Sequence, residues 1–323
     1  MAAAGSENST TVRTQERRPA KLPLAIRAAR AGFRVIGPYA PTLASSYAER
    51  LFLSPRRHRR PAWEEQALAG AERLHIPHEG RTLPGWKWGT GPSTVLLVHG
   101  WEGRGSQLAT FIEPLVARGL SVVTFDAPGH GDAPDGFASV VEHARAVASV
   151  GRYLGRLHAI IGHSVGGAAS LFALRLGLRV DRLALVAPPA NPEKFAAGFA
   201  KMLALPPKVN RGMLDRLERR YDVRMQDLDV RADAASLTVP LLVVHDVGDR
   251  VVSFEDGASL AQAAPHGRLV STHGLGHQRV LRAPEVVDAV VPFAADGVRA
   301  PAATPTFTES IEAELFFRDR RWV

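Results

Sequence analysis

The sequence contains no cysteine among its 323 residues. This absence excludes disulfide bonds, thiolate metal sites and a cysteine nucleophile. It fits a reducing compartment, and the polar first residues show no secretory signal pattern, so we expect a cytoplasmic protein. The chain also has no uninterrupted apolar run of about 18 residues, so we expect no membrane-spanning helix.

Acidic and aromatic residues are both scarce relative to basic residues. Lys and Arg number 40 against 32 Asp and Glu, which gives a formal net charge of +8, and aromatic residues make up 7% of the chain. Much of the positive charge lies early, including the run PRRHRRP at 55–61. Because no aromatic residue interleaves with that run, stacking on single-stranded nucleic acid has little support. We therefore expect a solvated face or a docked arm, and no nucleic-acid partner.

The first quarter of the chain is predicted to lie outside the core. Residues 1–21 are polar and are expected to form a disordered tail. Residues 22–79 are expected to form a helical extension, in which 22–54 divides near Gly37 and Pro38 into two amphipathic helices with spaced arginines. Two placements of these helices remain open. They can make a peripheral contact with a membrane surface, or pack on the body of the protein, which we favour.

From about residue 80, apolar strand patterns alternate with helix patterns. The run RTLPGWKWG at 81–89 reads as a turn leading into an edge strand. Because the later strands are apolar on both faces, we expect an α/β fold with a mostly parallel central sheet flanked by helices. Strand patterns occur at 93–100, 121–133, 157–164, 182–189, 239–252 and 267–280, and helix patterns at 107–119, 139–154, 165–177, 253–264 and 284–295.

Residues 191–236 interrupt this alternation. They are rich in Lys and Arg, contain no buried-strand run, and include two amphipathic patterns, EKFAAGFAKMLAL and MLDRLERRYDVRM. We interpret this segment as a short helical cap between two parts of the core, 80–190 and 237–298. The remaining segment, 299–323, is expected to be a C-terminal tail without an assigned role.

One apolar segment, LHAIIGHSVGGAASLFAL at 157–174, carries a serine where a strand passes into a helix. Gly162 and Gly166, two positions either side of Ser164, let strand and helix approach closely. The free N–H groups at the start of the helix favour negative charge beside the serine. This pattern indicates a nucleophilic serine at the apex of a sharp turn. A glycine-rich turn that binds a phosphate, or nothing, is the alternative.

A serine nucleophile needs an imidazole base, and the imidazole needs a carboxylate that sets its tautomer. Asp249 follows an apolar strand in HDVGDRVV, and His277 follows the next strand in HGLGHQRV. Both are expected at the carboxyl edge of the sheet, together with Ser164. His273 is the rival base and Asp246 the rival acid. We favour Asp249 because it lies further out on its loop.

A second set of residues is expected to stabilise the oxyanion. The sequence VHGWEG follows the strand at 93–98, which places the backbone amide of Trp101 near the serine. With the amide of Val165 it would supply two donors, each worth about 3 kcal/mol in catalysis. The alternative is that His99 and Gly100 form a simple corner. His163 is expected to point away from the site, and His130 to pack in a loop at its rim.

These motifs resemble the α/β-hydrolase superfamily, because five of them occur in the order typical of that family. They are GTGPSTVLLVHGWEG, FDAPGHGDA, GHSVGG, LLVVHDVGDRVV and GLGHQRV, and they span about 82–296. The resemblance implies the α/β-hydrolase fold and a nucleophile elbow at Ser164. One motif departs from the family, since Pro128 stands where Asp-x-Arg-Gly-His-Gly has arginine.

The resemblance implies acyl transfer through an acyl-enzyme, with Ser164 as nucleophile, His277 as base and Asp249 as its acid, and with no metal or cofactor. A serine at this position argues against dehalogenase or epoxide hydrolase chemistry. Because the cap is short, we expect a carboxylic ester of small to medium acyl chain as the small-molecule partner. Phe195, Phe199 and Met202 share one face of a cap helix. That face can simply pack on the rest of the protein, or it can line the acyl pocket.

Other functions remain open at this stage. Related members of the fold act on thioesters, on amides or peptide N-termini, or on carbon–carbon bonds. A non-catalytic, ligand-binding member of the fold is a further alternative.

Overall fold

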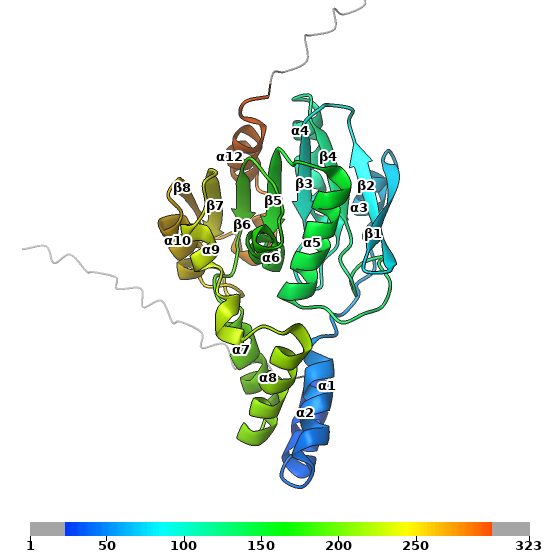
Figure 1. Ribbon diagram of the computed structural model, residues 1–323, viewed down its shortest axis with the longest axis vertical. Coiled ribbons are helices and arrows are strands. Elements are labelled where there is room, and N and C mark those ends of the chain that lie inside the picture. Colours follow the sequence, from blue (N-terminus) through cyan, green and yellow to red (C-terminus); the bar gives the residue numbers. More distant parts are fainter. Residues whose placement is uncertain (1–22, 299–323) are drawn as a thin grey trace, which may run out of the picture.

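The computed structural model describes residues 23–298, so the tails expected at 1–21 and 299–323 lie outside the described residues. Its centre is an eight-stranded sheet in the order β1-β2-β4-β3-β5-β6-β7-β8 (Figure 1). Strand β2 pairs antiparallel with both β1 and β4, and the other neighbours are parallel. The expectation of a mostly parallel α/β sheet is confirmed. The strands are β1 (Glu72–His78), β2 (Arg81–Trp88), β3 (Thr94–Val98), β4 (Ser121–Phe125), β5 (Ala159–His163), β6 (Leu183–Val186), β7 (Leu241–Asp246) and β8 (Gly267–Thr272).

Helices cover both faces of this sheet because alternate strand residues point to opposite sides. In β3, Leu96 and Val98 belong to one buried apolar cluster and Val95 and Leu97 to the other. The first cluster includes residues of α5 (Val140–Leu154), α6 (Val165–Arg175), α9 (Arg231–Ala235) and α10 (Phe254–Ala263). The second includes residues of a 3₁₀ helix (Gly105–Phe111), α4 (Ile112–Val116) and α12 (Pro284–Ala295). Two short helices, α3 (Ala62–Leu68) and α11 (Gly276–Arg279), complete the body.

Two segments of the body differ from the predicted pattern. Residues 72–78, expected within the helical extension, form β1, in which alternate side chains are buried. Strand β1 covers β2, so the strand expected at the edge of the sheet is an inner one. The single helix expected at 107–119 is a 3₁₀ helix followed by the short α4. Pro114 has no N–H to continue an α-helical ladder toward the preceding turn, which favours this break.

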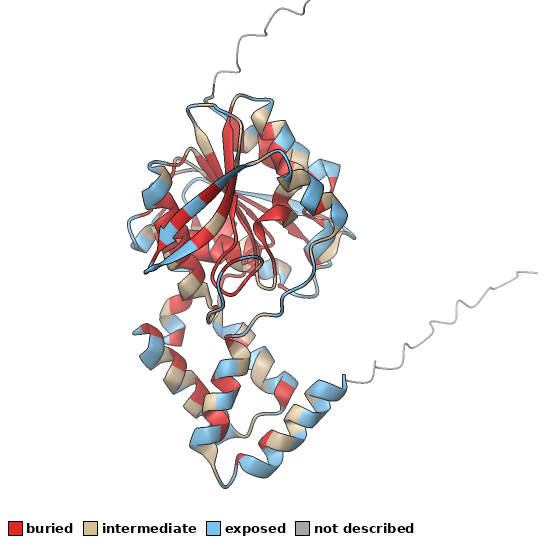
Figure 2. Ribbon diagram, turned by 90° about the vertical axis from the view of Figure 1, so that its right-hand side faces the viewer, coloured by how far each residue is buried: buried red, intermediate tan, exposed pale blue. Residues whose placement is uncertain are grey.

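Four further helices form a lid that projects from the body beyond one end of the sheet (Figure 1). They are α1 (Leu24–Ile36), α2 (Pro41–Phe52), α7 (Glu193–Leu203) and α8 (Pro207–Tyr221). We call this group the four-helix lid. Figure 2 shows that its outer surface is largely exposed, whereas the inner strands of the sheet are buried. None of the helices within 23–298 is long and apolar enough to cross a bilayer.

The lid joins two segments that are far apart in the sequence. The amphipathic pattern of 22–54 favoured packing on the body, but α1 lies against α7 and α2 lies along α8. Buried Glu49 on α2 accepts hydrogen bonds from Arg216 (2.5 Å) and Arg220 (2.7 Å) on α8. Arg30 on α1 donates to the backbone oxygen of Met202 at 2.7 Å. Apolar faces and partly exposed ion pairs to buried Glu49 therefore hold the N-terminal helices to the predicted cap.

The last part of 191–236 returns to the body. A 3₁₀ helix (Met225–Leu228) leads into α9, which packs on α6 and α10. Arg175 of α6 forms an ion pair with Asp233 of α9. Only the first two helices of this segment therefore belong to the lid.

Candidate active site

Ser164 stands at a strained turn between β5 and α6. Its backbone φ of 52° lies in the left-handed region, which a residue with a side chain occupies only when its surroundings impose it. The surroundings are tight, because a Cβ atom on Gly166 would lie 2.3 Å from the backbone oxygen of His99. The glycine at 166 thus lets α6 begin directly against the end of β3, with Ser164 at the junction.

The structure brings the three predicted triad residues together. His277 lies in α11, after β8, and its Nε2 is 3.0 Å from Ser164 Oγ. Its Nδ1 is 2.7 Å from Asp249 Oδ2. The rival residues lie elsewhere: His273 is exposed, and buried Asp246 accepts hydrogen bonds from the Thr272 hydroxyl and from backbone amides. Asp246 therefore ties the two loops together, and Asp249 is the carboxylate that contacts the imidazole.

The surroundings of Asp249 keep its carboxyl group ionised. Burial alone would raise its pKa, but hydrogen bonds from His245 and His277 and from the amides of Val251 (2.8 Å) and Val252 (3.0 Å) outweigh this effect. The pKa of Asp249 therefore lies well below its ordinary value. A carboxylate that accepts the Nδ1–H of His277 leaves the Nε2 lone pair free to accept the hydroxyl proton of Ser164. This is the tautomer that a general base requires.

Two backbone amides belong to residues next to Ser164, one by packing and one along the chain. Gly100 packs directly on the serine, since a Cβ atom at 100 would lie 2.9 Å from Ser164 Cβ, and Trp101 is the next residue. Val165 is the first residue of α6, where N–H groups have no partner within the helix. Among residues 23–298, the amides of Trp101 and Val165 donate to no protein acceptor. They are available to a negatively charged oxygen.

Neighbouring histidines support the backbone of the site. The ring of His163 lies beside the imidazole of His277, with ring centroids 4.9 Å apart, and donates from Nε2 to the backbone oxygen of His277 at 3.0 Å. His163 also lines the cavity at Ser164, so it does not point away from the site as expected. Burial lowers the pKa of His163 to about 3, so the ring stays neutral. His99 accepts from the amide of Ala127 at 3.0 Å, and the His130 ring contacts Trp101. The spacing of the motifs did not reveal this support role of His163.

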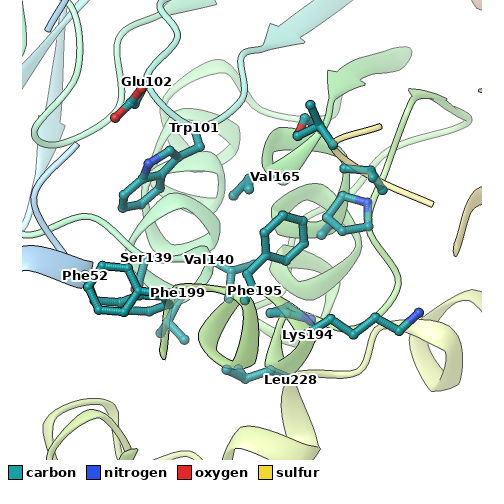
Figure 3. Close-up of a pocket in the computed structure, with 18 of the residues that line it drawn as sticks. Phe52, Trp101, Glu102, Ser139, Val140, Val165, Lys194, Phe195, Phe199 and Leu228 are labelled. Atoms are coloured by element: carbon teal, nitrogen blue, oxygen red, sulfur yellow. The ribbon is translucent and has the colours of Figure 1, made fainter. Parts of the chain in front are cut away.

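An apolar cavity of about 780 Å³ lies between the lid and the body, and Ser164 and His277 are in its wall. Phe195, Phe199 and Met202, the predicted pocket residues, all line it. Figure 3 shows Phe52 beside Phe199, with Phe195 between this pair and Lys194 in the view. The sequence did not point to the lining residues from α2 and α8. These are Leu51, Phe52, Leu217 and Tyr221.

Charged groups lie at the margins of this cavity. Lys194 on α7 pairs with buried Asp256 on α10, so an ion pair connects lid and body there. One group of three metal-ligating side chains, His78, Glu79 and Glu142, occurs within the described residues. These three do not line the cavity, so they are not positioned to act on a ligand bound at Ser164.

Solved structures share this architecture. An esterase from Pyrococcus furiosus is 18% identical, with a TM-score of 0.58 over 74% of this chain and 97% of that chain. A putative lipase from Acinetobacter baumannii AYE is 18% identical, with a TM-score of 0.55 over 74% and 97%. A bromoperoxidase from Bacillus anthracis is 17% identical, with a TM-score of 0.53 over 70% and 100%. At these identities the likeness shows the fold.

The sequence itself matches a family profile. No curated protein sequence matches the chain. The profile of the alpha/beta hydrolase family matches residues 95–290, which include the elbow and both loops that carry Asp249 and His277. This match covers more than half of the chain. The chain therefore belongs to the alpha/beta hydrolase family.

Proposed function

We propose that the protein is a serine hydrolase that cleaves carboxylic esters of small to medium acyl chain through an acyl-enzyme. The observation that carries the proposal is the continuous hydrogen-bonded chain from Ser164 Oγ through His277 to Asp249, at the wall of an apolar cavity. A hydroxyl, a base and an orienting carboxylate in this order are the components of nucleophilic acyl transfer.

The reaction follows from these contacts. Ser164 Oγ attacks the ester carbonyl while His277 Nε2 accepts the hydroxyl proton, and the amides of Trp101 and Val165 donate to the oxyanion. The bond between the carbonyl carbon and the leaving oxygen then breaks, and His277 gives its proton to the departing alcohol. A water molecule, deprotonated by His277, attacks the acyl-enzyme and releases the carboxylic acid. Asp249 stabilises the imidazolium in both steps.

Two features favour an ester as the substrate. The cavity is mainly apolar and lies within the range of about 300–1,000 Å³ that encloses small-molecule ligands. Its volume accommodates an acyl chain of medium length together with an alcohol. Two of the structural neighbours are described as an esterase and a putative lipase. These names support ester cleavage, and thioester or amide cleavage by the same triad is the alternative that the experiment must separate.

Labelling with a fluorophosphonate tests the proposed nucleophile. The wild-type protein should gain the mass of one phosphonyl group, and Ser164→Ala should gain none, because the hydroxyl that forms the adduct is absent. Intact-mass spectrometry measures both. An unlabelled wild-type protein would favour the non-catalytic alternative. Activity on p-nitrophenyl esters of rising chain length, compared with aminoacyl anilides, separates the bond types; hydrolysis of anilides alone would contradict the ester assignment.

The length of the acyl chain should depend on the contact between Phe52 and Phe199. These rings, from α2 and α7, lie 5.1 Å apart in an edge-to-face arrangement and both line the cavity. Phe199→Ala should enlarge that end and raise kcat/KM for decanoyl over butanoyl esters about tenfold, since one methylene in an apolar pocket discriminates by at least that factor. The measurement is the ratio of kcat/KM values across the p-nitrophenyl ester series.

Phe33→Ala is the matched control for Phe199→Ala, because it removes a phenyl ring from the packing of the lid without changing the cavity wall. Phe33 is buried in α1 and packs near Tyr47, with ring centroids 5.9 Å apart, but it does not line the cavity. Its replacement should leave the chain-length profile unchanged. A similar shift in both variants would mean that the lid as a whole, and not the Phe52–Phe199 contact, sets chain length.

A further inference from the structure

The free end of the four-helix lid exposes large apolar side chains. They lie at the end of α1, in the turn that follows it and on α2, at the part of the lid furthest from the sheet (Figures 1 and 2). We call these five residues the apolar tip. They are Val35 (65% exposed), Ile36 (47%), Tyr39 (89%), Leu43 (66%) and Tyr47 (54%).

Packing inside the lid prevents these side chains from turning inward. The turn between α1 and α2 is closed by hydrogen bonds from the amides of Tyr39 (3.1 Å) and Ala40 (2.8 Å) to the backbone oxygen of Ile36. Gly37 is buried against the start of α8, where an added Cβ would lie 2.9 Å from Pro206 and 3.1 Å from Val209. The exposure of the apolar tip is therefore imposed by the fold.

Positive charge is concentrated in the same part of the molecule. The four lid helices contain 11 Lys and Arg but only four Asp and Glu, an excess close to the net charge of +8 of the whole chain. Next to the tip, Arg34, Lys208 and Arg211 are exposed, and within residues 23–298 none of them forms an ion pair. Cations thus border the exposed apolar side chains.

We propose that the apolar tip docks the protein on the surface of an anionic lipid bilayer. Aliphatic side chains enter the acyl boundary, tyrosines favour the headgroup level, and Lys and Arg are attracted to acidic headgroups. Charge complementarity favours an anionic bilayer over a second copy of the chain as the binding partner, because two apolar tips in contact would bring like charges together. A protruding turn also differs from the grooves that bind peptides.

The proposal goes beyond ester hydrolysis and does not depend on it. Helices α2, α7 and α8 also carry the wall of the cavity, at Phe52, Phe199 and Tyr221. A bilayer at the tip would therefore bring the lid, and the cavity beneath it, next to a source of amphiphilic molecules.

Flotation of the full-length protein with vesicles tests the docking surface. The vesicles are phosphatidylcholine alone, or phosphatidylcholine with about 30% phosphatidylserine. Wild type should bind the anionic vesicles at least tenfold more tightly, and high salt should weaken this binding. The triple variant Val35→Ser, Tyr39→Ser, Leu43→Ser should bind the anionic vesicles at least tenfold less tightly than wild type. The triple variant Arg34→Gln, Lys208→Gln, Arg211→Gln should lose about 100-fold, at about fivefold for each cation.

Matched controls remove the same kinds of side chain from the body. The exposed pair Tyr153→Ser, Leu176→Ser and the exposed set Arg118→Gln, Arg179→Gln, Arg268→Gln should bind as wild type does. Thermal unfolding and hydrolysis of a soluble ester should be unchanged in all variants, which separates lost docking from misfolding. Equal binding to both vesicle types would overturn the proposal, as would full binding by the serine variant. A dimer that only the serine variant dissociates would instead identify the tip as an interface between copies.

Discussion

His277→Ala is expected to lower kcat by about 10⁴–10⁶-fold. The Nε2 atom of this imidazole lies 3.0 Å from the Ser164 hydroxyl oxygen, and within residues 23–298 no other imidazole forms a hydrogen bond with that hydroxyl. Without this imidazole, no base accepts the hydroxyl proton when Ser164 attacks, and no acid donates a proton to the leaving alcohol. Because the apolar side chains of the cavity would supply most of the binding contacts and the imidazole few of them, KM should change little. Steady-state kinetics on a p-nitrophenyl ester measure both parameters.

His273→Ala is the control for this variant. His273 lies four residues earlier, between β8 and α11, and is exposed, so its loss should leave kcat within about twofold of wild type. In His277→Ala, fluorophosphonate should still label Ser164, only slowly, because the hydroxyl remains but is not activated. If His273→Ala abolished turnover and His277→Ala did not, the assignment of the base would be wrong.

Asp249→Asn should lower kcat by about 10⁴-fold while leaving the fold intact. An amide of the same shape cannot hold the His277 ring with its proton on Nδ1, so Nε2 no longer accepts from Ser164. The carboxylate also stabilises the imidazolium that forms when the proton moves, and a neutral amide does not. The ratio of kcat values between variant and wild type, at matched folded fractions, measures the effect.

The same substitution should change the pH dependence of stability. The fold lowers the pKa of Asp249, so its ionised form stabilises the native state. Wild type should therefore have a larger free energy of unfolding than Asp249→Asn. This difference should be fully present above a pH of about 4, which is the ordinary pKa of an Asp side chain. It should then shrink as the pH falls further. Urea unfolding at a series of pH values measures this difference.

Asp246→Asn separates catalysis from loop structure. Asp246 is buried and accepts hydrogen bonds from Thr272, Leu275 and Gly248, but it does not contact His277. Its replacement should lower the melting temperature more than Asp249→Asn does, and kcat by far less. A large loss of kcat in the Asp246 variant, with normal turnover by the Asp249 variant, would identify Asp246 as the acid.

The local pattern of apolar and polar residues was sufficient to predict the core of this protein. Apolar strands alternating with helices predict the layered α/β sheet, because a strand buried on both faces has to be apolar at every position. The turn at Ser164 is equally readable, since its glycines and its place between strand and helix are all close in sequence. The spacing of the motifs also pointed to Asp249 and His277, whose catalytic roles remain predictions.

Contacts between distant segments could not be predicted in the same way. An amphipathic helix shows that it has a buried face but not what covers that face. For this reason the sequence by itself determined that 22–54 and 191–236 are helical, whereas only the tertiary structure decided that they form one lid. Because the two segments pair, Glu49 forms an ion pair with Arg216 and Phe52 forms part of the cavity wall. The exposure of Tyr39 also follows from this pairing, because a side chain is buried or exposed according to what the rest of the chain places beside it.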